Sequence, residues 1–168
     1  MGVIIIAALT VVLCGPADAA EGTEPMPSWH LNGAVGFLGN TVDGTAFAFN
    51  LGADRFLTPV FSVGPLLQLA TTSALFQTAL TLQAKYWITG LDTGSRLKIN
   101  VQGGIGFVHA DFLEDDTSWV IPIGVGLDYA LSRTLGLTTT FLLNFTDLNT
   151  GGGTDAHVMP GLTFGLRF

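Results

Sequence analysis

The side chains in this sequence that could do chemistry are few, and the densest group of them is acidic. Four carboxylates, Asp111, Glu114, Asp115 and Asp116, fall within six consecutive positions. Carboxylate oxygens are ligands that Ca²⁺ and Mg²⁺ prefer, so this run predicts a divalent-cation site in a loop. The spacing departs from that of a helix-loop-helix calcium site, and a solvated acidic loop is the competing interpretation.

A histidine, a serine and a carboxylate brought together would indicate a hydrolytic site. His109 is followed by Glu114 and Ser118, and His157 could approach Ser73 or Asp155. Neither set has a spacing that rises above chance. We therefore expect no catalytic residue, no enzymatic activity and no cofactor.

The composition indicates a membrane protein that does not cross the membrane with helices. The sequence is 48% hydrophobic and 11% charged, whereas soluble domains are about 25% charged. No apolar run reaches the roughly 18 residues that a spanning helix needs. Only helices and closed barrels satisfy their backbone groups in lipid, so a barrel is expected. The net charge is −7 and no basic stripe is present, so we expect no nucleic-acid partner.

Apolar residues occupy alternate positions in eight segments separated by turns rich in Gly, Asp, Asn and Thr. Each segment is long enough to cross a membrane as a tilted strand. The pattern predicts an all-β fold, an eight-stranded antiparallel up-and-down transmembrane β-barrel. The expected strands are approximately Trp29–Leu38, Thr45–Leu57, Phe61–Ala70, Leu75–Ile88, Leu97–Val108, Ser118–Ala130, Thr134–Thr146 and His157–Phe168.

Within each predicted strand, one set of alternate positions is apolar and the other is small or polar. We expect the apolar set to face lipid and the other set to face the lumen. Aromatic residues near both ends of the strands predict two interfacial belts. The outer belt comprises Phe37, Phe47, Phe76, Phe107, Trp119 and Phe145, and the periplasmic belt comprises Trp29, Phe56, Phe61, Tyr86, Trp87, Tyr129 and Phe168.

The first residues have the pattern of an export signal. Val3 to Cys14 is apolar, and Ala17-Asp18-Ala19 is a small-x-small cleavage motif. We predict a cleaved signal peptide at 1–19, a short periplasmic segment at 20–28 and the barrel at 29–168. Cys14 is the only cysteine, so no disulfide is expected after cleavage.

Three motifs resemble those of the small outer-membrane β-barrel superfamily, the OmpA, OmpX and OmpW kind. They are Gly52 to Pro59 (GADRFLTP), Gly124 to Leu131 (GVGLDYAL) and the ending Gly161 to Phe168 (GLTFGLRF). The resemblance implies an outer-membrane location with both termini in the periplasm, among outer-membrane lipids and lipopolysaccharide. It also implies that the C-terminal signal Phe164, Leu166 and Phe168 is read by the barrel-assembly machinery. The superfamily includes structural proteins, adhesins, small channels and lipid-modifying enzymes, so it does not define a function.

Charged residues of lumen parity gather at the expected periplasmic end. Isolated charges in a narrow lumen would be costly, so we expect them to pair and to form an ionic plug. Chain order places Lys98 between Lys85 and Asp128, and His30 between Arg167 and Asp54. The alternative is that these charges extend independently into the periplasm. The predicted plug residues are His30, Asp54, Lys85, Lys98, Asp128 and Arg167.

The outer half of the predicted lumen is lined by apolar and small residues. It could form an apolar cavity for an acyl chain or a small apolar molecule, or a packed interior. The residues of this candidate cavity are Leu38, Ala48, Ala79, Val120, Leu142 and Met159. Pro65, Pro122 and Pro160 interrupt strands, and each should weaken a seam of the barrel because proline has no backbone N–H.

Three functions are compatible with this sequence. The first is a non-enzymatic structural or surface-interaction role through short acidic outer loops, which we favour. The second is a small channel or uptake barrel for small apolar molecules. The third is a lipid A-modifying enzyme, but lipid A deacylases carry their His and Ser two residues apart, and here Asp111 stands two residues after His109.

Overall fold

The computed structural model describes residues 29–88, 96–132, 134–151 and 155–168. The predicted signal peptide, 1–19, and the segment 20–28 lie outside the described residues. No helix among the described residues is long and apolar enough to cross a membrane. The strands are β1 (Trp29–Thr41), β2 (Gly44–Thr58), β3 (Phe61–Thr71), β4 (Phe76–Ile88), β5 (Leu97–Asp111), β6 (Asp116–Ala130), β7 (Gly136–Asn149) and β8 (Asp155–Arg167).

These strands form one closed barrel in chain order, with β8 paired to β1. Every neighbouring pair is antiparallel. The predicted eight-stranded up-and-down barrel is therefore confirmed. Closure leaves no sheet edge along the wall, which is how a β-structure can satisfy its backbone groups inside a membrane.

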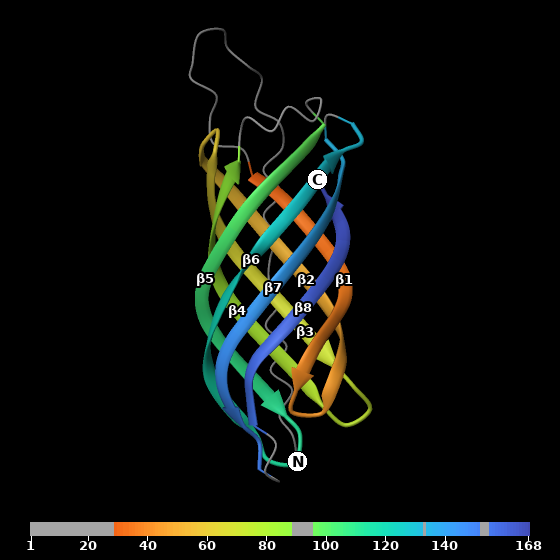
Figure 1. Ribbon diagram of the computed structural model, residues 1–168, viewed down its shortest axis with the longest axis vertical. Helices are drawn as coiled ribbons and strands as arrows, with labels where there is room; N and C mark the ends of the chain where they lie inside the picture. The colour runs from red at the N-terminus through yellow and green to blue at the C-terminus, as the bar shows by residue number, and fades with distance from the viewer. Residues whose placement is uncertain (1–28, 89–95, 133, 152–154) are drawn as a thin grey trace, which may run out of the picture.

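The two ends of the barrel are named here by the strand ends that they contain. We call the end where β1 begins and β8 ends the terminal end, and the opposite end the loop end (Figure 1). At the loop end, the strands continue past the predicted boundaries. β5 runs on to Asp111 and β6 starts at Asp116, because backbone pairing continues where the alternation of apolar residues has already stopped.

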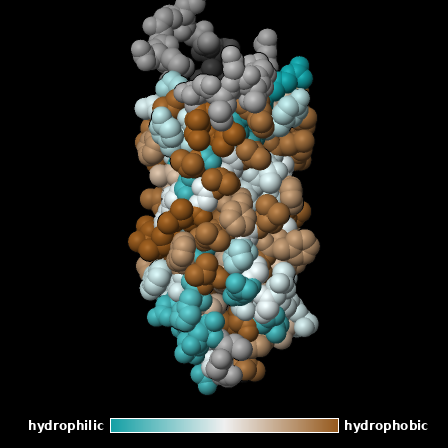
Figure 2. Space-filling view, in the orientation of Figure 1, coloured by the Kyte–Doolittle hydropathy of each residue, from teal (hydrophilic) through white to brown (hydrophobic). Residues whose placement is uncertain are grey.

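The two faces of the wall divide as the sequence predicts. Large apolar side chains cover the outside, and Phe107, for example, is 70% exposed. Figure 2 shows hydrophobic side chains over much of the barrel wall and hydrophilic ones gathered at the loop end. A soluble monomer rarely exposes so continuous an apolar surface, so this face suits lipid.

Two predicted belt residues are placed differently from the expectation. Trp87 is buried inside the lumen, and Phe56 stacks on it with 5.5 Å between ring centroids. Phe56 shares the inward parity of Asp54, and Trp87 shares that of Lys85. The belt prediction was wrong here because it grouped aromatic residues by height along the strand and ignored the face on which each one lies.

Each interrupting proline coincides with a break in a different seam. Pro65 lies on β3, Pro122 on β6 and Pro160 on β8. The β2–β3 pairing passes from Gly52–Leu66 to Arg55–Val63, the β5–β6 pairing passes from Gly103–Ile123 to Gly106–Val120, and the β1–β8 pairing ends at Leu38–Gly161. The missing proline N–H accounts for a lost ladder bond at each place.

Candidate functional site in the barrel lumen

The lumen near the terminal end is crossed by a first ion pair. Lys85 Nζ on β4 lies 2.8 Å from Asp54 Oδ2 on β2, so the pair spans β3. Asn32 Nδ2 on β1 donates a hydrogen bond to the same oxygen at 3.3 Å. Both charged side chains are largely buried, and in such surroundings a charge requires a partner.

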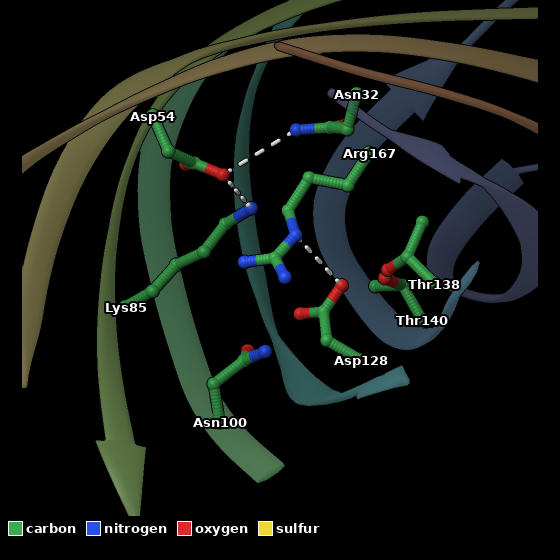
Figure 3. Close-up of a pocket in the computed structure, with 8 residues that line it drawn as sticks. All are labelled: Asn32, Asp54, Lys85, Asn100, Asp128, Thr138, Thr140 and Arg167. Atoms are coloured by element: carbon green, nitrogen blue, oxygen red, sulfur yellow. Dashed lines mark hydrogen bonds and ion pairs between the residues drawn. The ribbon is translucent and has the colours of Figure 1, made fainter. Parts of the chain in front are cut away.

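A second ion pair lies beside the first (Figure 3). Arg167 Nε on β8 is 3.6 Å from Asp128 Oδ1 on β6, so this pair spans β7. The intervening strand presents Gly136, where an added Cβ would lie 3.4 Å from a guanidinium nitrogen of Arg167. Gly136 therefore lies directly beside the guanidinium, at ordinary van der Waals distance.

Two residues of the predicted plug are arranged differently from the other four. Lys98 is exposed although its backbone pairs with Asp128, and no ion pair to it occurs among the described residues. A lysine at the mouth can keep its stem on the wall and its ammonium group in water. His30 pairs in the ladder with Asp54, and its ring contacts Phe56 edge-on at 5.1 Å. The predicted order of neighbours therefore does not give the observed ion pairs, which each skip one strand.

An aromatic layer lies next to the ion pairs on the side of the terminal end. Trp87 Nε1 donates a hydrogen bond to Ser62 Oγ at 3.1 Å. The Arg167 guanidinium carbon lies 5.8 Å from the centroid of the Trp87 ring, within the range of a cation–π contact. Together with the Phe56 stack, these contacts fill the lumen with side chains beside the two ion pairs. We call the two ion pairs and the residues around them the ionic cluster.

A small cavity lies within the ionic cluster. Its volume is about 20 Å³ as available to the centre of a water molecule, which is room for about one water. The space is too small for an acyl chain or an organic ligand. Its lining residues are Asn32, Asp54, Lys85, Asn100, Asp128, Thr138, Thr140 and Arg167 (Figure 3).

The apolar lumen residues lie toward the loop end. All six residues of the candidate cavity are buried, with exposed fractions of 3% or less. Five of them belong to one continuous packed cluster, together with Val108, Leu148 and other apolar side chains. We call this set the apolar cluster. Leu142 is buried as well but lies outside it.

Comparison with known proteins identifies the fold. No protein-family profile and no curated protein sequence matches this chain. Among solved structures, Neisserial surface protein A is similar over 83% of this chain and 94% of its own, with a TM-score of 0.62 and 18% identity. A de novo designed transmembrane β-barrel has a TM-score of 0.51 at 13% identity, covering 86% of this chain and 97% of its own. Ail, the attachment invasion locus protein of Yersinia pestis, has a TM-score of 0.50 at 12% identity over 83% and 96% of the two chains.

This fold is that of a small outer-membrane β-barrel. At these identities the likeness extends to the fold alone, so the function must be argued from this chain's own residues. In such a barrel the outward face of the last strand meets lipid. Phe164, Leu166 and Phe168 are all exposed on that face, as an assembly signal requires, and their recognition by the assembly machinery remains a prediction.

The carboxylates of the acidic loop are directed to different places. Among the residues that the structure describes, no group of three or more His, Cys, Asp or Glu side chains converges. Asp116 instead accepts hydrogen bonds from the backbone N–H groups of Asn149 and Thr117, both at 2.8 Å. The Glu114 side chain lies beside Gly151. Strands β5 and β6 extend into the acidic run, which directs its carboxylates to different surroundings, and the cation site stays a prediction.

Neither histidine set forms a hydrolytic site. His109 lies on the outer face, where its Nδ1 is 2.8 Å from the hydroxyl of Thr117, whereas Ser118 has the inward parity of β6. The β7–β8 register shifts between Phe145 and Leu148, and beside this irregularity His157 is exposed, 3.4 Å from Asp147. His157 has the same parity as the buried Met159 but lies outside, because simple alternation does not continue through a bulge.

Sequence reasoning also missed members of the ionic cluster. Asn32, Thr138 and Thr140 line the cavity without being charged. Their inward parity and their position near the strand ends were readable from the sequence, but a search for charges passes over them. The pairing of β1 and β7 with β8 brings them beside Arg167.

Proposed function

We propose that this protein is an outer-membrane barrel with a non-enzymatic structural or surface-interaction role, performed by its loop end and not by its lumen. The observation that carries this proposal is the filling of the lumen. Aromatic side chains, two ion pairs and the apolar cluster follow one another between the two ends. A lumen filled in this way offers no wide aqueous path, which leaves the outer surface as the place for activity.

The loop end has the features of a defined surface. Hydrogen bonds join neighbouring hairpins: Asp43 accepts one from the Thr72 hydroxyl, and Glu114 N–H donates to the carbonyl of Thr150 at 3.1 Å. Leu113 is 66% exposed among acidic neighbours. No Lys or Arg occurs in the sequence near these hairpins. Such a surface suits contact with basic or cation-bridged partners.

The proposed orientation places the loop end outside the cell and both chain termini in the periplasm. Connection length does not assign the two ends, because the longest connection, between Ile88 and Leu97, lies at the terminal end. The assignment rests on the resemblance to small outer-membrane barrels, whose chain termini are periplasmic. A matched pair of cysteine variants tests it, because the only native cysteine is Cys14. A membrane-impermeant maleimide added to intact cells should label Ser73→Cys and should spare Ser132→Cys until the outer membrane is permeabilised. The reverse pattern would refute the orientation.

The role of the loop end can be tested in a strain that lacks the protein. Complementation with the wild type should restore surface attachment and detergent resistance to whatever extent the strain has lost them. A variant with Leu113→Ser, Glu114→Gln and Asp115→Asn should reach the membrane in equal amount without restoring the lost property. Full restoration by this variant would contradict a role for these loop residues. Arg55→Gln, at the terminal end, serves as the control substitution.

The uptake alternative makes a different prediction. In an uptake barrel for apolar molecules, the side chains of the apolar cluster would have to move apart. Vesicles that contain the purified protein would then take up such molecules. Stable conductance or saturable uptake by the wild type would favour this alternative over the surface role.

A further inference from the structure

We propose that a hydrogen-bonded water occupies the ionic cluster and that the polar part of the lumen between this cluster and the apolar cluster is hydrated. The apolar cluster is then the gate that excludes ions. This inference goes beyond the surface role, because it concerns what closes the lumen. It assigns the barrier to the side chains at the loop end and not to the ion pairs.

The ionic cavity has the construction of a water site. Asn100 Oδ1 and Asp128 Oδ1 both belong to residues that line it, and both atoms are buried without a hydrogen-bond partner. The Arg167–Asp128 separation of 3.6 Å is too long for a direct hydrogen bond. One water fits the available volume. It can donate to both oxygens while accepting from Lys85 or Arg167.

Farther from the terminal end, the lumen carries a band of buried amides. Gln83 donates to Thr81 Oγ1 at 3.3 Å. Gln77 lies within the apolar cluster, since its ladder partners Ala70 and Ala110 belong to that cluster, and it donates to Met159 Sδ at 3.7 Å. The amide atoms that have no partner are Asn50 Oδ1, Gln68 Nε2, Gln77 Oε1 and Gln83 Oε1. Leaving buried polar atoms unpaired is expensive, and native proteins leave few of them so. Ordered water is the usual partner in such places.

Apart from Gln77, which lies between Ala70 and Ala110, the apolar cluster is chemically unlike this band. Leu38, Val120 and Val108 are essentially fully buried and offer no side-chain atom to which water can bind. Met159 marks the boundary, because its sulfur and its carbonyl oxygen accept from Gln77 and Asn144 while its side chain packs into the cluster. An apolar constriction stops ions by excluding the water that they carry. Ion pairs beside a hydrated cavity are a weaker barrier, since hydrated charges can rearrange.

The first test needs no substitution. In protein labelled with ¹⁵N and with ¹³C at its methyl groups and folded in deuterated detergent, the side-chain amide groups of Gln68 and Gln83 should show NMR cross-peaks to long-lived water. The methyl groups of Leu38 and Val120 should show none. Absence of water contacts at the glutamine side chains, or water contacts at the two methyl-bearing residues, would overturn the proposal.

The second test uses conductance in planar bilayers. Leu38→Ser combined with Val120→Ser should produce discrete current steps that the wild type lacks. The matched control is Leu38→Ala with Val120→Ala, which makes similar space without polar atoms and should remain closed. Neutralising the second ion pair with Asp128→Asn and Arg167→Gln should also leave the barrel closed. A gel shift on heating confirms folding of each variant.

The outcomes separate this inference from the proposed function. If the wild type conducts, the lumen is a pathway and both proposals fail. If the ion-pair variant opens the barrel while the serine variant stays closed, the barrier lies at the ion pairs, and only the gate assignment is overturned. If the alanine and serine variants open equally, the barrier is steric packing and not exclusion of water, which also overturns the gate.

Discussion

Arg167, the next-to-last residue of the chain, reaches across strand β7 to Asp128 on β6 at a distance of 3.6 Å. The same guanidinium lies over the Trp87 ring. The last strand is thus held by contacts through the lumen in addition to its hydrogen bonds with β1 and β7. This arrangement makes the last residue of β8 part of the barrel's interior.

Removal of Arg167 should therefore destabilise the barrel strongly. Arg167→Met leaves the Asp128 carboxylate buried without its charged partner, and breaking a buried pair in this way costs about 3–5 kcal/mol. Urea titration of the protein in lipid vesicles measures the free energy of unfolding. The double variant Arg167→Met with Asp128→Leu should recover most of the loss, because no unpaired charge remains. Equal stability of the single variant and the wild type would contradict the ion pair.

Trp87 should behave differently from the other two tryptophans. Trp29 and Trp119 are exposed on the outer face, whereas Trp87 is buried in the lumen. Brominated lipids quench fluorophores that touch them. Single-tryptophan proteins that retain Trp29 or Trp119 should be quenched in brominated vesicles, and the one that retains Trp87 should not. Strong quenching of Trp87 would show that it contacts lipid at the interface, and it would contradict the aromatic layer in the lumen.

Gly64 should tolerate no side chain. A Cβ at this position would lie 1.7 Å from the carbonyl oxygen of Ala53 on the neighbouring strand, so backbone would have to move. We expect Gly64→Ala to cost at least the ~1–3 kcal/mol typical of overpacking, seen as loss of the folded band in unheated gels. Gly33→Ala is the matched control, since its nearest neighbour would be a flexible leucine methyl group at 3.7 Å. Equal folding yields would show that the wall at Gly64 can relax.

Asp116 should hold two hairpins of the loop end together. Its carboxylate accepts from Asn149 N–H at 2.8 Å, and a hydrogen bond to a charged group contributes about 1.5–3 kcal/mol. Asp116→Ala should therefore increase the rate of limited proteolysis in the hairpin between β7 and β8. Asp115→Ala, at an exposed neighbour, makes the same change in charge and should have little effect. Equal cleavage rates of the two variants would show that the Asp116 carboxylate does not hold the two hairpins together.

The salt bridge between His157 and Asp147 should matter little. Both side chains are well exposed, at 65% and 70%, and surface pairs of this kind contribute about 0–1 kcal/mol. His157→Ala should leave the urea midpoint within error of the wild type. A large loss of stability would indicate that the bulged start of β8 contributes more to closure than its exposure suggests.

Much of the fold was predictable from the sequence because a transmembrane barrel imposes a simple rule on it. Each strand must present lipid on one side and the lumen on the other, so a period of two appears in all eight strands. The inward parity of Asp54, Lys85, Asp128 and Arg167 follows from that rule. The pattern fails where the rule stops applying, at the bulge near His157 and at the loop-end extensions of β5 and β6.

The class of protein, the number of strands and the face on which most side chains lie could be read from the residues alone, since these depend on local alternation and on the solvent that each face meets. The partners of the charged residues became clear from the closed barrel. Lys98 and Asp128 are paired on adjacent strands, but they do not form an ion pair. Each observed ion pair instead joins residues on two strands that are separated by a third. The reason is physical: distances across the lumen and access to water at its mouth select the partners, and both exist only once the barrel has closed.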